Sequence, residues 1–71
     1  MSRFTVSFTD KADAETRQTL AMLVEISQWG KAQPQGGGSA LVIEPEAKHN
    51  EAVKAQLAEL KQQGILTWTE S

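Results

Sequence analysis

Two segments of this chain share one pattern and lie 34 positions apart. They are Glu25-Ile-Ser-Gln-Trp-Gly30 and Glu59-Leu-Lys-Gln-Gln-Gly64. Each closes a stretch with the apolar spacing of a helix and precedes a stretch that reads as a strand. The same spacing aligns Leu23 with Leu57. The repeat therefore predicts a fold built from two similar half-units related by a pseudo-twofold axis.

The length and composition of the chain limit the size of that fold. Its 71 residues, 39% of them hydrophobic and 23% charged, are typical of a single small globular domain, which we expect over residues 1–71. A chain of this size buries only about 60% of its unfolded surface, so its core is small. The sequence contains no cysteine, which excludes disulfides and thiolate metal ligands. A small core makes association with a second copy a reasonable hypothesis.

Charge and hydropathy argue against nucleic-acid and membrane partners. The formal net charge is −2, and the basic residues are dispersed: Arg3, Lys11, Arg17, Lys31, Lys48, Lys54 and Lys61. No cluster of them could neutralise a run of phosphates. No stretch approaches the roughly 20 apolar residues of a membrane span, and the first residues lack the apolar segment of a signal peptide. We expect a cytoplasmic protein.

The first half of the chain has the pattern of a strand followed by a helix. Phe4, Val6 and Phe8 alternate with polar residues, which is the period of a strand with one buried face. Asp10 is expected to cap the helix that follows. Gly30 is expected to end that helix in a left-handed conformation.

The second half begins with the pattern of a hairpin. A short strand is expected over Lys31–Gln35, where Pro34 restricts it to a sheet edge because proline has no N–H for the ladder. Gly36–Gly38 is the turn. The apolar run Ser39–Glu44 is the next strand, and we place it beside the first strand at the centre of the sheet.

A second helix and a last strand complete the chain. Asn50 is a candidate cap for this helix, Gly64 ends it, and Ile65–Thr69 is the last strand. The order is therefore βαββαβ. Right-handed crossovers then place both helices on one face of a four-stranded antiparallel sheet, the α+β arrangement called ferredoxin-like. A three-stranded sheet without the Lys31–Gln35 strand is the main alternative.

The open face of the sheet is the first candidate for a functional surface. Its expected polar residues are Thr5, Ser7, Thr67 and Thr69. On that face they would be joined by every second residue of the third strand, and two such alternate sets are possible. We take the exposed residues of that strand to be Leu41 and Ile43, which would give a polar sheet an apolar centre. Such a patch could bind a partner protein or a second copy.

Trp29 and the glycine turn complete the predicted contact surface. Trp29 stands at a helix end, where a large aromatic can be partly exposed and contribute to an interface. Gly36, Gly37 and Gly38 are expected to form a flexible hairpin turn, with a mobile contact loop as the alternative. Trp68 is predicted to pack under the second helix.

No pattern in the sequence predicts catalysis, a cofactor or a metal. The glycine turn precedes a strand, whereas a phosphate loop needs a helix N-terminus. Glu44, Glu46, His49 and Glu51 lie close together, but their spacing matches no calcium or zinc motif, and acidic residues are expected where a helix begins. Nothing in the sequence places Ser39, a candidate nucleophile, beside His49. We expect a non-enzymatic protein.

The layout from Arg3-Phe-Thr-Val-Ser-Phe to Gly64-Ile-Leu-Thr-Trp-Thr-Glu resembles the propeptide-type inhibitors of subtilisin-like proteases, which also run βαββαβ over about this length. By topology it also resembles ligand-sensing regulatory domains that dimerise through a ferredoxin-like sheet. The main hypothesis is a protein-interaction or regulatory module that acts through its open sheet face or an edge strand, alone or as a homodimer. A small-molecule-sensing domain and a propeptide-like protease inhibitor are the alternatives.

Overall fold

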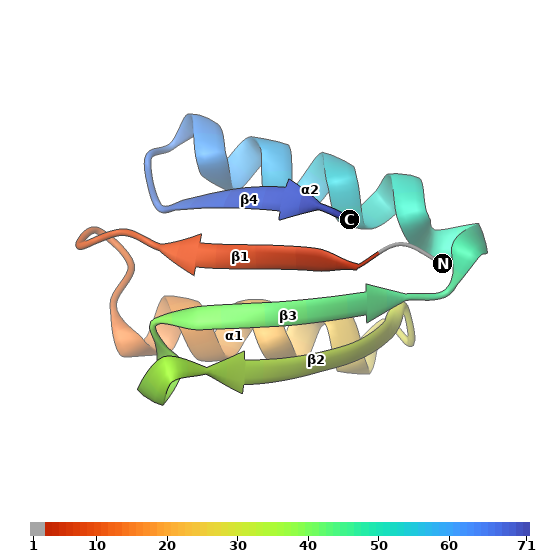
Figure 1. Ribbon diagram of the computed structural model, residues 1–71, viewed down its shortest axis with the longest axis horizontal. Helices are drawn as coiled ribbons and strands as arrows, with labels where there is room; N and C mark the ends of the chain where they lie inside the picture. Colours follow the sequence, from red (N-terminus) through yellow and green to blue (C-terminus); the bar gives the residue numbers. More distant parts are fainter. Residues whose placement is uncertain (1–2) are drawn as a thin grey trace.

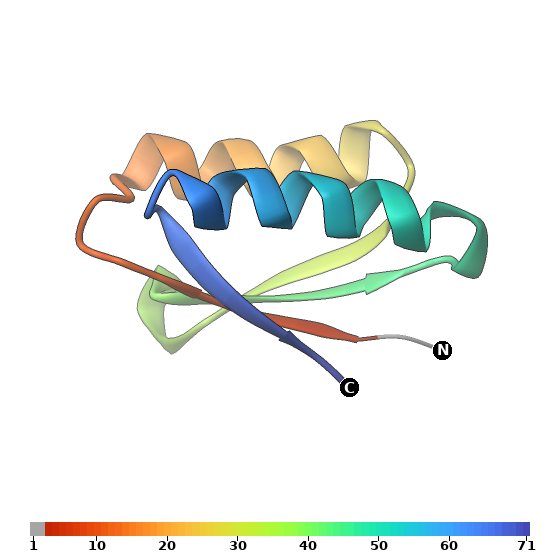
Figure 2. The same ribbon diagram turned by 90° about the horizontal axis from the view of Figure 1, so that it is seen from above.

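The chain folds into one four-stranded sheet with two helices on one of its faces (Figures 1 and 2). The computed structural model describes residues 3–71; residues 1–2, part of the domain expected over 1–71, lie outside the described residues. In chain order the elements are β1 (Phe4–Phe8), α1 (Ala14–Ile26), β2 (Gly30–Gln35), β3 (Ala40–Pro45), α2 (Asn50–Gln62) and β4 (Leu66–Glu70). Short 3₁₀ turns at Gly36–Gly38 and Ala47–His49 precede β3 and α2. The predicted order βαββαβ is confirmed.

The strands lie in the order β2-β3-β1-β4, and each neighbouring pair is antiparallel. β1 and β3 are therefore central, while β2 and β4 form the two edges. Because β2 pairs with β3 from Gly30 to Gln35, the three-stranded alternative is wrong. The helices cover one face and leave the other open (Figure 2), which is the predicted ferredoxin-like arrangement.

The hydrophobic core fills the space between the sheet and the helices. On β1, Phe4 and Val6 are fully buried and Thr5 between them is exposed, as the alternation predicts. The buried members of the core are Phe4, Val6, Leu20, Val24, Ala32, Leu41, Ile43, Val53, Leu57 and Leu66. Among residues 3–71 no polar or charged residue is buried. Burial of apolar surface is therefore the main interaction that holds the two layers together.

Helix α1 begins with a side-chain cap. The backbone N–H of Thr16 donates a 2.8 Å hydrogen bond to Oδ1 of Asp13, which is the N-cap residue. The prediction that Asp10 caps this helix is wrong. The chain first makes a turn in which the N–H of Ala12 donates to the carbonyl of Thr9 at 3.0 Å, and this turn delays the start of the helix.

Helix α1 ends at Ile26 with Ser27 as its C-cap, before it reaches the glycine that was predicted to end it. The N–H of Trp29 donates to the carbonyl of Val24 at 3.0 Å, and the N–H of Gln28 donates to that of Glu25 at 3.1 Å. This pair of bonds is the Schellman cap, whose left-handed residue is Gln28 with φ 58°. Gly30 is the first residue of β2, so its predicted role as the cap is wrong.

Helix α2 ends in the same cap, formed as predicted around Gly64. The N–H of Ile65 donates to the carbonyl of Leu60 at 3.1 Å, and that of Gly64 donates to Lys61 at 2.9 Å. Gly64 has φ 78°, so its counterpart in the first half is Gln28. Because α1 begins at residue 14 and α2 at residue 50, the helices repeat at 36 positions, not 34.

Candidate interaction surfaces

Leu41 and Ile43, predicted to lie on the open face, lie in the core. Leu41 is 2% exposed and Ile43 is fully buried. In the sheet Leu41 is opposite Val6, and Ile43 is opposite Phe4. Residues directly opposite each other share a face, so both side chains point toward the helices. The prediction that they form an exposed partner-binding patch is wrong.

The loop lengths explain this error. Five residues, 9–13, join β1 to α1, whereas four, 46–49, join β3 to α2. A shift of one residue moves every side chain of a strand to the other face. The 34-residue spacing of the repeat matches Val42 with Phe8, which faces the helices. In the structure Val42 instead points to the open face. The consecutive apolar residues of β3 gave no alternation that could have revealed the shift.

The open face is polar. Its central apolar residue, Val42, is half-buried between Gln33 on β2 and Thr5 on β1. At one end of the face, Nη2 of Arg3 lies 3.6 Å from Oε2 of Glu44, and these side chains are 59% and 45% exposed. An exposed ion pair of this kind contributes little stability. A valine in polar surroundings does not provide the apolar centre that the prediction required.

Trp29 and the glycine turn lie at opposite ends of β2 (Figure 1). Trp29 is half-buried against the core. Gly36, Gly37 and Gly38 follow β2 with φ values of 58°, 69° and 99°, which glycine adopts most readily. The six residues of β2 separate the two sites by roughly 20 Å. The structure therefore does not bring these predicted contact residues into one surface.

The edge strand β2 has features that hinder pairing with another chain. The N–H of Glu46 donates to the carbonyl of Trp29 at 2.8 Å, so by alternation the odd-numbered residues of β2 face β3 and the even-numbered ones face outward. Pro34 is one of the outward residues and has no N–H to offer. Lys31 stands on the same strand. Proline and lysine are residues by which natural edge strands avoid pairing.

The edge strand β4 contains neither proline nor lysine. Next to it, Ser71 and Arg3 exchange two backbone hydrogen bonds of 2.9 and 3.2 Å, which fixes the alternation along this pair of strands. Leu66 and Trp68 consequently direct their N–H and C=O groups away from the sheet. The outer edge of β4 therefore presents backbone donors and acceptors to which a further strand could bond.

A shallow groove of about 740 Å³ runs between the outer edge of β4 and α2. Trp68 of β4 lines it: the side chain packs against the core, as predicted, but is only half-buried. Its ring lies edge-on to Phe4 at a centroid distance of 5.5 Å. Ala55 and Ala58 of α2 are exposed and small, which leaves room above the strand. The other lining residues are Glu59, Lys61 and Gln62. The groove thus combines a strand edge with an apolar wall.

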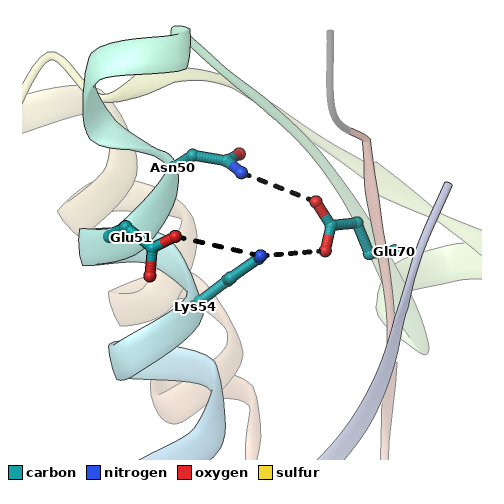
Figure 3. A network of polar contacts seen from close by, with 4 residues as sticks. All are labelled: Asn50, Glu51, Lys54 and Glu70. Atoms are coloured by element: carbon teal, nitrogen blue, oxygen red, sulfur yellow. Dashed lines mark hydrogen bonds and ion pairs between the residues drawn. The ribbon is translucent and has the colours of Figure 1, made fainter.

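Polar contacts hold the end of β4 under the start of α2 (Figure 3). Nζ of Lys54 lies 3.2 Å from Oε1 of Glu70 and 4.0 Å from Oε1 of Glu51. The side-chain amide of Asn50 donates to Oε2 of Glu70 at 3.5 Å. The Glu51 side chain is 90% exposed. Lys54 thus links the end of β4 to the first turn of α2.

Helix α1 carries a different apolar feature on its outer side. Met22 is 56% exposed and Ile26 is 73% exposed, and the two lie one turn apart on the helix. Residues three or four apart form a continuous patch, so this pair is a second candidate contact surface.

The side chains that could bind a metal ion are dispersed within residues 3–71. No three His, Asp or Glu side chains in that range are placed to hold a metal ion, so Glu44, Glu46, His49 and Glu51 do not converge. The pKa of Asp13 lies below its ordinary value because of hydrogen bonds from the Thr16 side chain and backbone N–H. This carboxylate caps α1, which accounts for its shift without a catalytic role.

Neither helix of the described residues has the length and apolar character needed to cross a membrane. Comparisons with protein families, with curated proteins and with solved structures found no significant match. Function is therefore inferred from the surfaces of the protein itself.

Proposed function

We propose that this protein is a non-enzymatic interaction module that binds an extended segment of another protein along the outer edge of β4. The difference between the two sheet edges carries this proposal. Leu66 and Trp68 direct backbone groups outward on a strand without proline or lysine, whereas β2 carries both. An added strand would bond to β4 through its main chain, which is a recurrent mode of peptide recognition.

The groove beside β4 supplies the selectivity that main-chain bonding lacks. In a strand added to β4, alternate side chains would point toward α2. There they would meet the Trp68 indole and the small side chains of Ala55 and Ala58. Aromatic residues in such positions commonly contribute much of the binding energy of an interface.

The test begins with linear peptides selected from a random display library on the immobilised protein. The binding of the selected peptides is then measured on two proteins made by chemical synthesis. One carries an N-methyl group on the outward amide of Trp68, and the matched control carries it on the outward amide of Ala32, at the β2 edge. Neither change removes a bond within the sheet, because both N–H groups point outward.

We expect N-methylation of Trp68 to weaken the selected peptides at least ten-fold and N-methylation of Ala32 to leave them unchanged. An Ile26→Lys variant tests the α1 patch in the same assay. If the selected peptides bind the Trp68-modified protein as well as the unmodified one but fail to bind Ile26→Lys, the binding site is on α1 and the proposal is overturned.

A further inference from the structure

Arg17 of α1 differs from the other unpaired basic residues of the protein. Within residues 3–71, four basic residues form no ion pair: Lys11, Arg17, Lys31 and Lys61. Arg17 is the one member of this set that is partly buried. Asp13, one turn earlier on α1, interacts with it electrostatically but lies beyond ion-pair distance. Basic residues are mostly exposed unless they are paired, so the place of Arg17 needs an explanation.

Two contacts hold the guanidinium of Arg17 in place. Its Cζ lies 5.6 Å from the centroid of the Phe8 ring, a distance at which a cation is attracted to the face of an aromatic ring. Its Nη1 donates a long, weak hydrogen bond of 3.5 Å to the carbonyl oxygen of Gly38. The start of α1 and the glycine turn lie at the same end of the molecule, which allows this contact (Figures 1 and 2).

Most of the hydrogen-bond donors of this guanidinium are unused. Nε is buried and donates to no acceptor in the described part of the chain, and Nη2 has no acceptor there either but is not buried. A buried donor without an acceptor destabilises a folded protein, whereas an exposed arginine keeps its donors hydrated. Stability alone therefore does not explain the position of Arg17. Stacking on Phe8 holds the guanidinium where Nη2 can donate to an acceptor from outside the protein.

Arg17 lines a cavity of about 370 Å³ between α1 and the glycine turn. This volume falls within the range of small-molecule sites in proteins. Among the described residues that line the cavity, Arg17 is the only charged one, and Ala21, Pro34 and Leu41 contribute apolar walls. A Cβ at Gly37 would meet nothing within 4 Å, so the turn leaves space for a ligand. The cavity thus combines one cation with an otherwise uncharged, largely apolar wall.

We infer that this cavity binds a small organic monocarboxylate with a hydrocarbon or aromatic body. One guanidinium matches one negative charge, and its planar set of donors fits the two oxygens of a carboxylate. The body of the ligand lies against the apolar walls at Ala21 and Pro34. The lining shares no residue with the β4 groove, so this site goes beyond the proposed function and does not depend on it.

Two-dimensional amide NMR of the full chain tests the site with benzoate and hexanoate as probes. Benzamide and hexanamide are the matched neutral compounds, and inorganic phosphate tests for a general anion site. We expect both carboxylates to shift the backbone signals of Gly37 and Gly38 in a saturable way. The neutral amides and phosphate should bind at least about ten-fold more weakly, because hydrogen bonds between charged groups are among the strongest and phosphate lacks the apolar body.

Variants of the lining distinguish a binding role of Arg17 from a structural one. Arg17→Gln should weaken benzoate at least about ten-fold, and Arg17→Lys, which keeps the charge but not the planar donors, should restore only part of the affinity. Lys31→Gln is the matched control, since Lys31 is exposed and lies outside the lining. Ala21→Leu keeps the charge but fills the cavity, and should also weaken benzoate. Urea unfolding of Arg17→Gln should show no loss of stability.

Three results would overturn the inference. They are the absence of any shift with both carboxylates, equal binding of benzoate and benzamide, and unchanged benzoate binding in Arg17→Gln. Phosphate that binds as tightly as benzoate would overturn the assignment of the ligand as an organic carboxylate. If Arg17→Gln did not fold, the comparison of benzoate with benzamide on the wild-type protein would still decide whether the charge of the ligand is recognised.

Discussion

Gln28 and Gly64 occupy the same position in the two halves of the fold. Each follows the C-cap of a helix in a left-handed conformation, with φ values of 58° and 78°. Each also donates its N–H to a helix carbonyl, at 3.1 and 2.9 Å. Glycine adopts this conformation without a steric penalty, whereas a side chain costs roughly 1–2 kcal/mol. The first half therefore carries backbone strain that the second half avoids.

Replacing Gln28 with glycine should stabilise the protein. We expect the Gln28→Gly variant to gain about 1 kcal/mol in the free energy of unfolding, measured by urea denaturation. For a chain of this size, that gain corresponds to a rise in Tm of about 4–8 °C. Gln63→Gly is the matched control, because Gln63 has a right-handed φ of −79° and glycine there should give no gain. A loss of stability in Gln28→Gly would show that the side chain contributes more than the strain costs.

The face of β3 that is buried can be tested with two adjacent residues. Ile43→Glu places a charge in the core and should cost more than about 4 kcal/mol, which would unfold a domain this small. Val42→Glu adds the same charge to the open face and should cost about 1 kcal/mol or less. Circular dichroism and urea unfolding distinguish the two variants. A folded Ile43→Glu protein would contradict the register of β3 against β1.

The layers and strand order of the fold could be predicted from the sequence because they depend on strong periodic signals. Two such signals are the alternation of Phe4, Val6 and Phe8 and the helical stripe through Leu57. Both remain recognisable when the boundaries of the elements are slightly misplaced. The face of β3 could not be predicted in this way, because Leu41 to Ile43 are consecutive apolar residues. Their face is set by a one-residue difference in loop length.

The candidate site could be predicted only in part. Pro34 identifies β2 as a protected edge, and the lack of proline and lysine in β4 was a visible signal that the sequence interpretation did not use. The groove itself requires that α2 lies over β4 with Ala55 and Ala58 on its outer side. The position of α2 depends on how the two helices divide one face of the sheet between them, and no local sequence pattern determines this.

Gly30 is required for the close approach of β2 to β3 rather than for a helix cap. A Cβ at this position would lie 2.5 Å from Cα of Pro45 and even closer to the carbonyl oxygen of Glu44. Both neighbours are backbone atoms of a paired strand and cannot move independently. We expect Gly30→Ala to lose about 3 kcal/mol in urea unfolding. Gly37→Ala, where a Cβ meets nothing within 4 Å, should lose only about 1 kcal/mol, and equal losses would refute the packing argument.

The cap of α1 should make stability depend on pH. The folded pKa of Asp13 lies below its ordinary value of 3.8, first because of the Thr16 side chain and then because of the Thr16 backbone N–H. A depressed pKa means that the charged carboxylate stabilises the folded state. This stabilisation is complete above the unfolded pKa, which is the ordinary value of 3.8, and is lost as pH falls through the folded pKa.

Asp13→Asn isolates this effect, because asparagine also caps helices well but does not titrate. We expect the stability difference between wild type and Asp13→Asn to be constant from about pH 5 to 7. Below about pH 4 the difference should move in favour of the variant, as the wild-type carboxylate becomes protonated. Urea unfolding at several pH values measures it. A difference that stays flat down to about pH 2 would mean that the Thr16 hydrogen bonds do not distinguish the charged carboxylate from the neutral one.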